Sequence, residues 1–272
     1  MICFIQESPT DFLLYYPIIK SIEDKKEYVV YDVSDKSTID IIHFLSQNTP
    51  TCVVSYGASH RKTSIVMLCK EYEIKFINLH GDERYVSRDI NPVKSAYMET
   101  ISSLSYQNFV SKQGAIAFLR DEGIQTPIGL FECPITHLAR RKRDSEQRDV
   151  IIVFEDENKK RLIENELLMK KYSFYSYDLS NGVPNNINKL YSDLNASKFI
   201  VSDCFIFDNV SHFLGKHFFY AGNDVLGIDN LGISTHMIDK KLELHDYLKQ
   251  SWRTLSEVNP KHGIQSLLKL LT

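Results

Sequence analysis

Short runs of β-branched and aromatic residues alternate with helical stretches along most of this 272-residue chain. Each run has the length of one buried strand, and turn residues separate it from the stretch that follows. Parallel strands need a crossover of a dozen or more residues between them, and a helix is the usual crossover. The alternation therefore predicts an α/β fold built from parallel sheets.

The pattern places strands and helices in two successive series. The strands of the first series are Met1–Ile5, Tyr28–Val33, Thr51–Ser55, Ile74–Leu79, Asn108–Val110 and Ile128–Phe131. Its helices are Phe12–Ile22, Ile39–Ser46, Arg61–Glu71, Tyr97–Ser105 and Lys112–Glu122, and Gly123 follows at a position that favours a left-handed helix stop. The second series has strands at Val150–Phe154, Tyr172–Leu179, Phe199–Val201 and Phe218–Tyr220, and helices at Asn158–Met169, Ile187–Leu194, Phe207–Leu214 and Leu242–Lys249.

A charged stretch without an apolar face, Leu138–Arg148, lies between the two series. We expect a linker there, so that domains 1–138 and 149–250 each form one α/β unit. The basic residues 140–143 fit solvated charges at a boundary, and phosphate or membrane-surface binding is the minority alternative. We expect 251–272 to return to the first domain as a helix, because an apolar stripe needs a surface to cover it; that stripe is Ile264, Leu267, Leu268 and Leu271.

Composition excludes several classes of protein. The formal net charge of −3 gives no basic field for a nucleic-acid backbone, so nucleic acid is not an expected partner. No run approaches the roughly 18 apolar residues of a membrane-spanning helix, and the first residues do not resemble a signal peptide, so we expect a cytoplasmic protein without a transmembrane segment. The odd number and scattered spacing of the cysteines predict buried thiols and not disulfides or metal ligands; they are Cys3, Cys52, Cys69, Cys133 and Cys204.

Two strand-end turns of the first domain carry the chemistry that we expect there. In the turn after residue 55, Gly57 permits close backbone approach, and the helix that begins near His60 offers N–H groups to an anion. The loop 78–84 places His80, Asp82 and Arg84 together. His80 fits a general base toward an acceptor hydroxyl, and a turn-stabilising hydrogen bond is an equally supported interpretation.

One turn of the second domain, residues 202–209, has small and acidic residues between a strand and a helix. Asp203 fits a helix cap slightly better than a ligand contact, and Asp208 could meet ribose hydroxyls. The chain has no G-x-G-x-x-G, phosphate-binding lysine loop, nucleophile elbow or H-E-x-x-H motif. The expected ligand contacts in these strand-end turns are Gly57, His60, Arg84, Arg88, Ser202, Asp203, Cys204, Asp208 and Asn209.

Four segments in chain order resemble the UDP-N-acetylglucosamine 2-epimerase group of GT-B proteins. The segments are Pro9–Ile22, Asn108–Gly123, Ser202–Lys216 and Asn259–Gly263, which is similar to that group's Asn-Pro-Tyr-Gly loop. The resemblance implies a GT-B fold: two Rossmann-like parallel-sheet domains that face a central cleft, with a C-terminal helix that crosses back to the first domain. The family's catalytic acids fall here on Ser55-Tyr56-Gly57, Asn78-Leu79-His80 and Val93-Lys94-Ser95, none of which is acidic.

A second GT-B group, the CDP-glycerol glycerophosphotransferases, resembles other parts of the chain. Leu79-His80-Gly81 is similar to that group's Trp-His-Gly strand end, which would make His80 the base that activates the acceptor. Ser202-Asp203, Phe207-Asp208 and the residues 215–220 look like its second-domain pattern.

The two resemblances favour an enzyme that moves a sugar or sugar-like group from a nucleotide-activated donor to an acceptor hydroxyl, in bacterial surface polysaccharide synthesis. The donor is a substrate, and neither a cofactor nor a metal is expected, because helix N-termini and basic groups neutralise the leaving diphosphate. A glycan or lipid-linked acceptor and a homo-oligomer are compatible with this interpretation. One alternative is an epimerase-like nucleotide-sugar isomerase or hydrolase, in which Asp82 would supply a carboxylate in place of the family's missing acids. The other is a catalytically silent nucleotide-binding scaffold.

Overall fold

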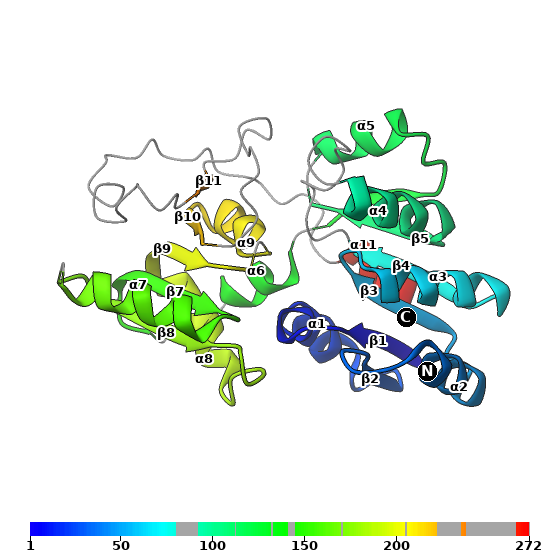
Figure 1. Cartoon of the computed structure of the whole chain (residues 1–272), viewed down its shortest axis with the longest axis horizontal. Coiled ribbons are helices and arrows are strands. Elements are labelled where there is room, and N and C mark those ends of the chain that lie inside the picture. Colours follow the sequence, from blue (N-terminus) through cyan, green and yellow to red (C-terminus); the bar gives the residue numbers. More distant parts are fainter. Residues whose placement is uncertain are drawn as a thin grey trace. The chain divides into compact units, whose positions relative to one another are not determined.

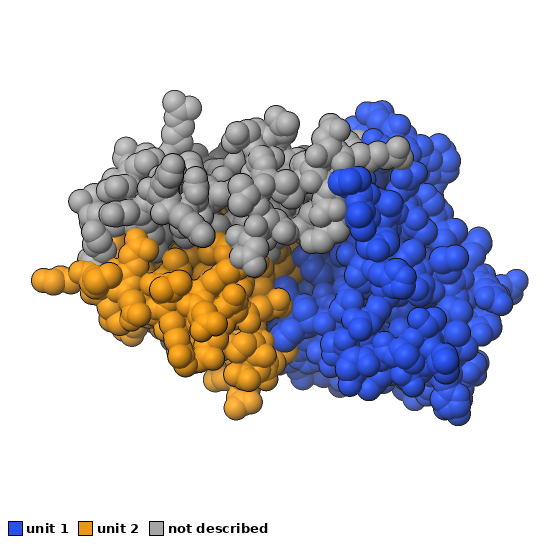
Figure 2. Space-filling view, in the orientation of Figure 1, with its two compact units in different colours: residues 1–132, 262–272 blue, residues 133–261 orange. Residues whose placement is uncertain are grey.

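The computed structural model describes residues 1–79, 92–111, 113–131, 133–140, 145–169, 171–204, 206–221, 235–237 and 265–271. The chain divides into two compact units. Unit 1 contains Met1–Glu132 and His262–Thr272, and unit 2 contains Cys133–Lys261 (Figure 2). In the described part of the chain, no helix is long and apolar enough to cross a membrane.

Unit 1 is built on a parallel sheet with the strand order β2-β1-β3-β4-β5-β6 (Figure 1). The first strand in sequence lies between β2 and β3, because the chain adds β2 on one side before it crosses to β3 on the other. The strands are β1 (Ile2–Gln6), β2 (Tyr28–Asp32), β3 (Cys52–Tyr56), β4 (Lys75–Leu79), β5 (Gln107–Val110) and β6 (Ile128–Leu130).

Local signals fix the ends of the helices in unit 1. Ser37 caps α2 by accepting from the Asp40 backbone N–H, and Ser59 caps α3 in the same way from Lys62. Gly123 follows α5 with φ +83°, which confirms the predicted left-handed stop. The helices are α1 (Pro9–Ile22), α2 (Thr38–Asn48), α3 (His60–Glu71), α4 (Pro92–Leu104), α5 (Gln113–Asp121) and α11 (Gln265–Leu271).

The helices cover both faces of this sheet, and strand β1 shows how. Cys3 and Ile5 lie in a buried cluster with residues of α2, α3 and α4. The intervening Phe4 packs on the opposite face against Tyr15 of α1, with the ring centroids 5.2 Å apart. Helix α11 packs beside α1, so the C-terminal stripe contacts unit 1.

Unit 2 repeats the same plan with a parallel sheet of order β11-β10-β9-β7-β8. Ile163 and Leu167 of α7 pack on Val150, Ile152 and Phe154 of β7, the first strand of this unit in sequence. The strands are β7 (Arg148–Phe154), β8 (Phe174–Asp178), β9 (Ser197–Ser202), β10 (His217–Tyr220) and β11 (Thr235–Met237), and the helices are α6 (Pro134–Ala139), α7 (Glu157–Met169), α8 (Ile187–Ala196) and α9 (Ile206–Leu214).

The two parallel-sheet α/β units confirm the predicted fold class. The boundary between them differs from the expected one, because the chain enters unit 2 at Cys133, ahead of the charged stretch. The reason is α6, a short helix that the sequence pattern did not predict and that packs against α8 and α9. Unit 2 also extends to Lys261, beyond the expected end of the second domain at residue 250.

Candidate functional site

Four of the predicted site residues, His80, Asp82, Arg84 and Arg88, lie outside the described residues. Their roles stay predictions. The others lie at the last residue of β9, in the turns that follow β3 and β9, or in the first turn of the helix after each.

In unit 1 the carboxyl ends of β1 and β3 form the topological switch point of the sheet, because the chain leaves these neighbouring strands in opposite directions. Ligands of open α/β sheets bind at such points. Gly57 lies just after β3 with φ +69°, and a Cβ atom at this position would meet nothing within 4 Å. Only its left-handed backbone conformation therefore favours glycine here. The Gly57 N–H donates to the carbonyl of Leu79 at 2.9 Å, so the turn is tied to β4.

His60 is the first residue of α3 and is exposed. Its ring meets the Tyr97 ring of α4 edge-on, with the centroids 6.1 Å apart. Gly57 and His60 thus lie within a few residues of one another, next to the switch point.

A buried ion pair joins the two turns of this switch point. The Lys62 ammonium lies 3.2 Å from Asp11 Oδ2 and donates to the Tyr56 carbonyl at 2.5 Å. Lys62 is 5% exposed and Asp11 is 3% exposed. Burial raises the pKa of the Asp11 carboxyl, although Lys62 and the backbone N–H groups of Glu7 and Ser8 oppose the shift. Lys62 therefore links the start of α1 to the end of β3.

The backbone N–H groups after β1 are occupied by the same carboxylate. Asp11 Oδ2 accepts from the N–H of Glu7 at 2.7 Å and from that of Ser8 at 3.3 Å. The Glu7 side chain lies 3.6 Å from both Arg61 Nη1 and Lys62 Nζ. Sequence reasoning missed this cluster. The Ser8-x-x-Asp11 spacing was its visible signal, because it is typical of a helix start.

The switch point of unit 2 lies between β7 and β9 and is organised in a similar way. Asp203 Oδ1 accepts from the N–H of Glu155, and its Oδ2 accepts from that of Asp156, both at 2.9 Å. The Ser202 hydroxyl donates to the Val153 carbonyl at 2.5 Å and accepts from the Cys204 N–H at 3.0 Å. Asp203 thus binds the backbone of the β7–α7 turn, a contact that the sequence did not predict.

The remaining predicted residues of unit 2 are covered by protein. Asp208 is 1% exposed and Asn209 is 5% exposed, both within α9, and Cys204 is 7% exposed. In both units, therefore, a carboxylate of the protein itself accepts hydrogen bonds from the two backbone N–H groups that follow the unit's first strand. This carboxylate is Asp11 after β1 and Asp203 after β7.

Lys216, which follows α9, is a basic group without an acidic partner among the hydrogen bonds of the described residues. Its ammonium donates to the carbonyls of Asn195, at 2.8 Å, and Ser197, at the end of α8. Burial lowers the pKa of Lys216 to about 8. The carbonyls favour the ammonium and oppose this shift.

The pKa of Lys216 predicts a pH dependence of stability. Between about pH 8 and the ordinary lysine pKa of 10.5, the unfolded chain binds more protons at this position than the folded chain. The contribution of Lys216 to the free energy of unfolding should therefore rise with pH across this window. Urea unfolding of wild type and Lys216→Met between pH 7.5 and 10 measures it. The free energy of unfolding of wild type should rise relative to that of the variant as the pH increases. A difference that stays constant with pH contradicts the lowered pKa of Lys216.

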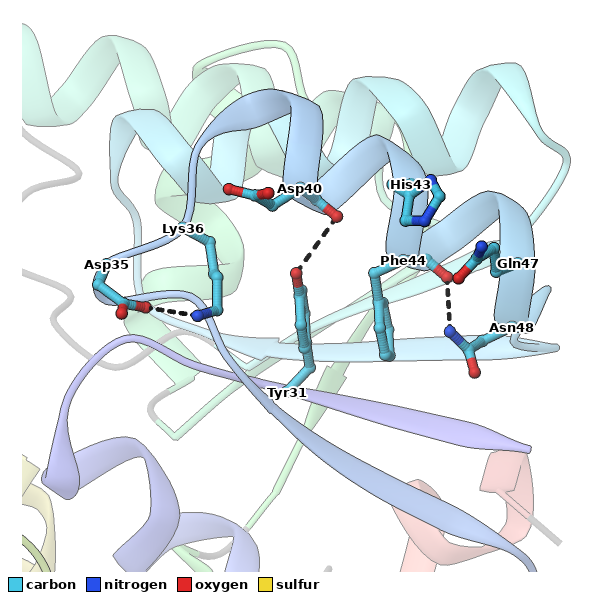
Figure 3. A pocket seen from close by; sticks show the side chains of 8 residues that line it. All are labelled: Tyr31, Asp35, Lys36, Asp40, His43, Phe44, Gln47 and Asn48. Atoms are coloured by element: carbon cyan, nitrogen blue, oxygen red, sulfur yellow. Dashed lines mark hydrogen bonds and ion pairs between the residues drawn. The ribbon is translucent and has the colours of Figure 1, made fainter.

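Two hollows lie away from these turns. One of about 350 Å³ lies in unit 1 between β2 and α2, where the Tyr31 and Phe44 rings stack 3.8 Å apart (Figure 3). Figure 3 also shows Lys36 paired with Asp35 at one end and Asn48 bonded to the Phe44 carbonyl at the other. The second, of about 250 Å³, is lined by β8 and α8 of unit 2. Neither contains a predicted site residue, and no group of three or more metal-binding side chains occurs among the described residues.

Comparison with solved structures identifies the fold. UDP-GlcNAc 2-epimerase from Methanocaldococcus jannaschii, solved with UDP-GlcNAc and UDP, matches with a TM-score of 0.68 and 13% identity over 99% of both chains. The chain has the GT-B fold. The Neisseria meningitidis UDP-GlcNAc 2-epimerase bound to UDP-GlcNAc is similar to this GT-B chain at 14% identity and TM-score 0.56, over 80% of this chain and 81% of that one.

A third structure, the S. aureus MnaA–UDP complex, gives 11% identity and TM-score 0.58 over 80% and 78% of the two chains. No family model matches the sequence, and no curated protein does. The resemblance to GT-B epimerases is therefore confirmed at the level of the fold.

Proposed function

We propose that this GT-B protein transfers a sugar or sugar-like group from a nucleotide-activated donor to an acceptor hydroxyl. The main support is the likeness over 99% of both chains to a structure that holds UDP-GlcNAc and UDP. The polar turns at the two switch points add to this support, because open α/β sheets bind ligands there. The acceptor is a glycan or a lipid-linked group.

Within this proposal, His80 removes the proton of the acceptor hydroxyl, and Asp82 assists it. Arg84, Arg88 and the helix that begins at His60 neutralise the diphosphate that leaves. The turn Ser202–Asn209 holds the nucleotide.

Transfer is favoured over epimerisation because the positions that match the epimerase acids are not acidic. Asp11 does not replace them, since it is buried and bonded to Lys62. A nucleotide-sugar isomerase or hydrolase is the second candidate, and the likeness to 2-epimerases favours it. The third is a catalytically silent scaffold, which the use of Asp203 by the fold favours.

A panel of UDP-, CDP- and CMP-linked donors, incubated with and without acceptors, separates the three candidates. Nucleotide release that depends on an acceptor supports transfer. Release without an acceptor supports the isomerase or hydrolase, and a thermal shift without turnover supports the scaffold.

His80→Ala should lower the rate of transfer by roughly 10²–10⁴-fold, the usual contribution of a general base. Donor affinity, measured by calorimetry, should change little. The control is His43→Ala, which removes an exposed imidazole from α2 of the same unit and should leave the rate unchanged. Transfer that survives in His80→Ala rules out this residue as the base.

A further inference from the structure

The hollow between β2 and α2 of unit 1 is long and narrow. Its lining runs from Asp35, in the turn after β2, to Asn48, the last residue of α2. This helix has 11 residues, so the lining extends over about 16 Å at the usual helical rise. The volume of about 350 Å³ is at the lower end of the range of ligand pockets, which is about 300–1,000 Å³. A hollow of this length and volume fits a single extended chain.

The end of the hollow at Asp35 lies near the switch point of unit 1. Strand β2 is the neighbour of β1, and the Val33 N–H that follows it donates to the carbonyl of Gln6, the last residue of β1, at 2.8 Å. The hydrogen bond from Lys36 and, more weakly, the charge of Arg61 hold the pKa of Asp35 below its ordinary value. Arg61 belongs to the ion-pair cluster of the switch point. A ligand bound at the switch point can therefore continue into the hollow.

The middle of the hollow is an aromatic wall. The rings of Tyr31 from β2 and Phe44 from α2 are nearly parallel, at 5°, with their centroids 3.8 Å apart. Figure 3 shows the two rings between Lys36 on one side and Asn48 on the other. Both aromatic residues are half-buried, so part of each is open to a ligand. Aromatic surface with a few polar groups beside it is the usual lining of a ligand pocket.

The polar groups of the hollow offer hydrogen bonds without a surplus of positive charge. Lys36 is the only lysine or arginine among the described residues that line it, and its ammonium is 3.0 Å from Asp35. Each of the two holds the other in its charged form, which lowers the pKa of Asp35 and raises that of Lys36. At the far end, Gln47 and Asn48 are exposed amides that can donate and accept. Hydroxyl groups also do both, so this lining suits an uncharged ligand with many hydroxyls better than a phosphate.

We propose that this hollow is an accessory site for the acceptor and that the acceptor is an uncharged glycan chain. The inference rests on the proposed function. The reacting hydroxyl lies at the switch point, and the sugar units that precede it lie along α2. Their C–H groups contact Tyr31 and Phe44, and their hydroxyls bond to Asp35, Gln47 and Asn48. A lipid linked through phosphate finds no unpaired lysine or arginine in this lining, so the glycan is favoured over the lipid-linked acceptor.

Titration of the full chain with uncharged oligosaccharides, followed by calorimetry or NMR, tests the proposal. The probes are oligomers of glucose and of N-acetylglucosamine, from the single sugar to the hexamer. Wild type should bind the longer oligomers more tightly. Asp35→Ala with Gln47→Ala should weaken binding of the hexamer at least tenfold, because it removes hydrogen bonds at both ends of the hollow. The matched control is Ile39→Ala with Ser46→Ala, which changes exposed residues of α2 outside the hollow and should leave the affinity unchanged.

Kinetics distinguish a failure of this site from a failure of the proposed function. With a long acceptor, the Asp35→Ala, Gln47→Ala variant should raise KM and leave kcat unchanged, and with a single-sugar acceptor it should change neither. A wild type that binds no oligomer, a variant with unchanged affinity, or a hollow that binds an extended peptide in place of glycans overturns the proposal. Oligosaccharide binding that the variant weakens supports the site even without transfer, and that combination contradicts only the proposed function.

Discussion

Replacing Lys62 by methionine is expected to lower the free energy of unfolding of unit 1 by about 3–5 kcal/mol at pH 7. The substitution leaves the Asp11 carboxylate, 3% exposed, without its cationic partner. It also removes the donor to the Tyr56 carbonyl. Urea unfolding followed by circular dichroism measures the loss.

The loss should depend on pH in a definite direction. Burial already raises the pKa of Asp11 above its ordinary value of 3.8, and without Lys62 that pKa should rise further. A folded state that holds a proton more tightly than the unfolded state gains stability as the pH falls toward 3.8. The difference between wild type and variant should therefore be smaller at pH 5 than at pH 7.

Two further variants separate the ion pair from general packing. Arg61→Met changes the neighbouring cation, whose side chain is 42% exposed, and should cost less than about 1 kcal/mol. Asp11→Asn combined with Lys62→Met removes both charges and should recover part of the loss. A single variant Lys62→Met that is as stable as wild type would refute the account of this cluster.

The second large effect is expected for Asp203→Ala, at roughly 3 kcal/mol of lost stability in unit 2. Each carboxylate oxygen accepts one backbone N–H at 2.9 Å, and hydrogen bonds to charged groups contribute about 1.5–3 kcal/mol each. Alanine leaves the N–H groups of Glu155 and Asp156 without this acceptor. The measurement is again urea unfolding, with the amide exchange rates of both residues as a local readout.

The matched control for Asp203 is Asp149→Ala in the same unit. The Asp149 carboxylate also has several partners, including Lys198 at 2.8 Å, but its side chain is 31% exposed at the start of β7. Its removal should cost less than Asp203→Ala, about 1 kcal/mol. If the two variants lose equal stability, the anchoring role of Asp203 is not supported.

The strands and most helices of this chain were predictable because apolar periodicity is a local signal. Strands such as β7 read as continuous apolar runs, and α9 was located to within one residue at its start. Helix α6 was missed because six residues are too few to show a period, and Pro134 at its start looks like a loop residue. Because α6 packs against helices of unit 2, the boundary between the units lies at Cys133 and not within the charged stretch that follows.

The site was less predictable because its contacts join residues far apart in sequence. The pairing of Lys62 with Asp11 and that of Asp203 with the β7–α7 turn depend on which strands are neighbours in the sheet. A carboxylate just after a strand fits a cap, a ligand contact or a backbone anchor equally well until the sheet order is known. The sequence located the turns that follow β3 and β9 and left the partners of their side chains undetermined.

The sulfur chemistry of the chain has a practical consequence. All five cysteines are free and buried, and burial raises the pKa of Cys52 and Cys69 to about 12 and that of Cys3 still further. Thiolate is the reactive form, so Cys3, Cys52 and Cys69 are poor targets for maleimide or for oxidants in the folded protein, and burial restricts the access of reagents to the other two sulfurs. A new cysteine at an exposed position would therefore react much faster than the native cysteines. Spin or fluorescence labels could then be attached to each unit in turn without first removing any natural cysteine.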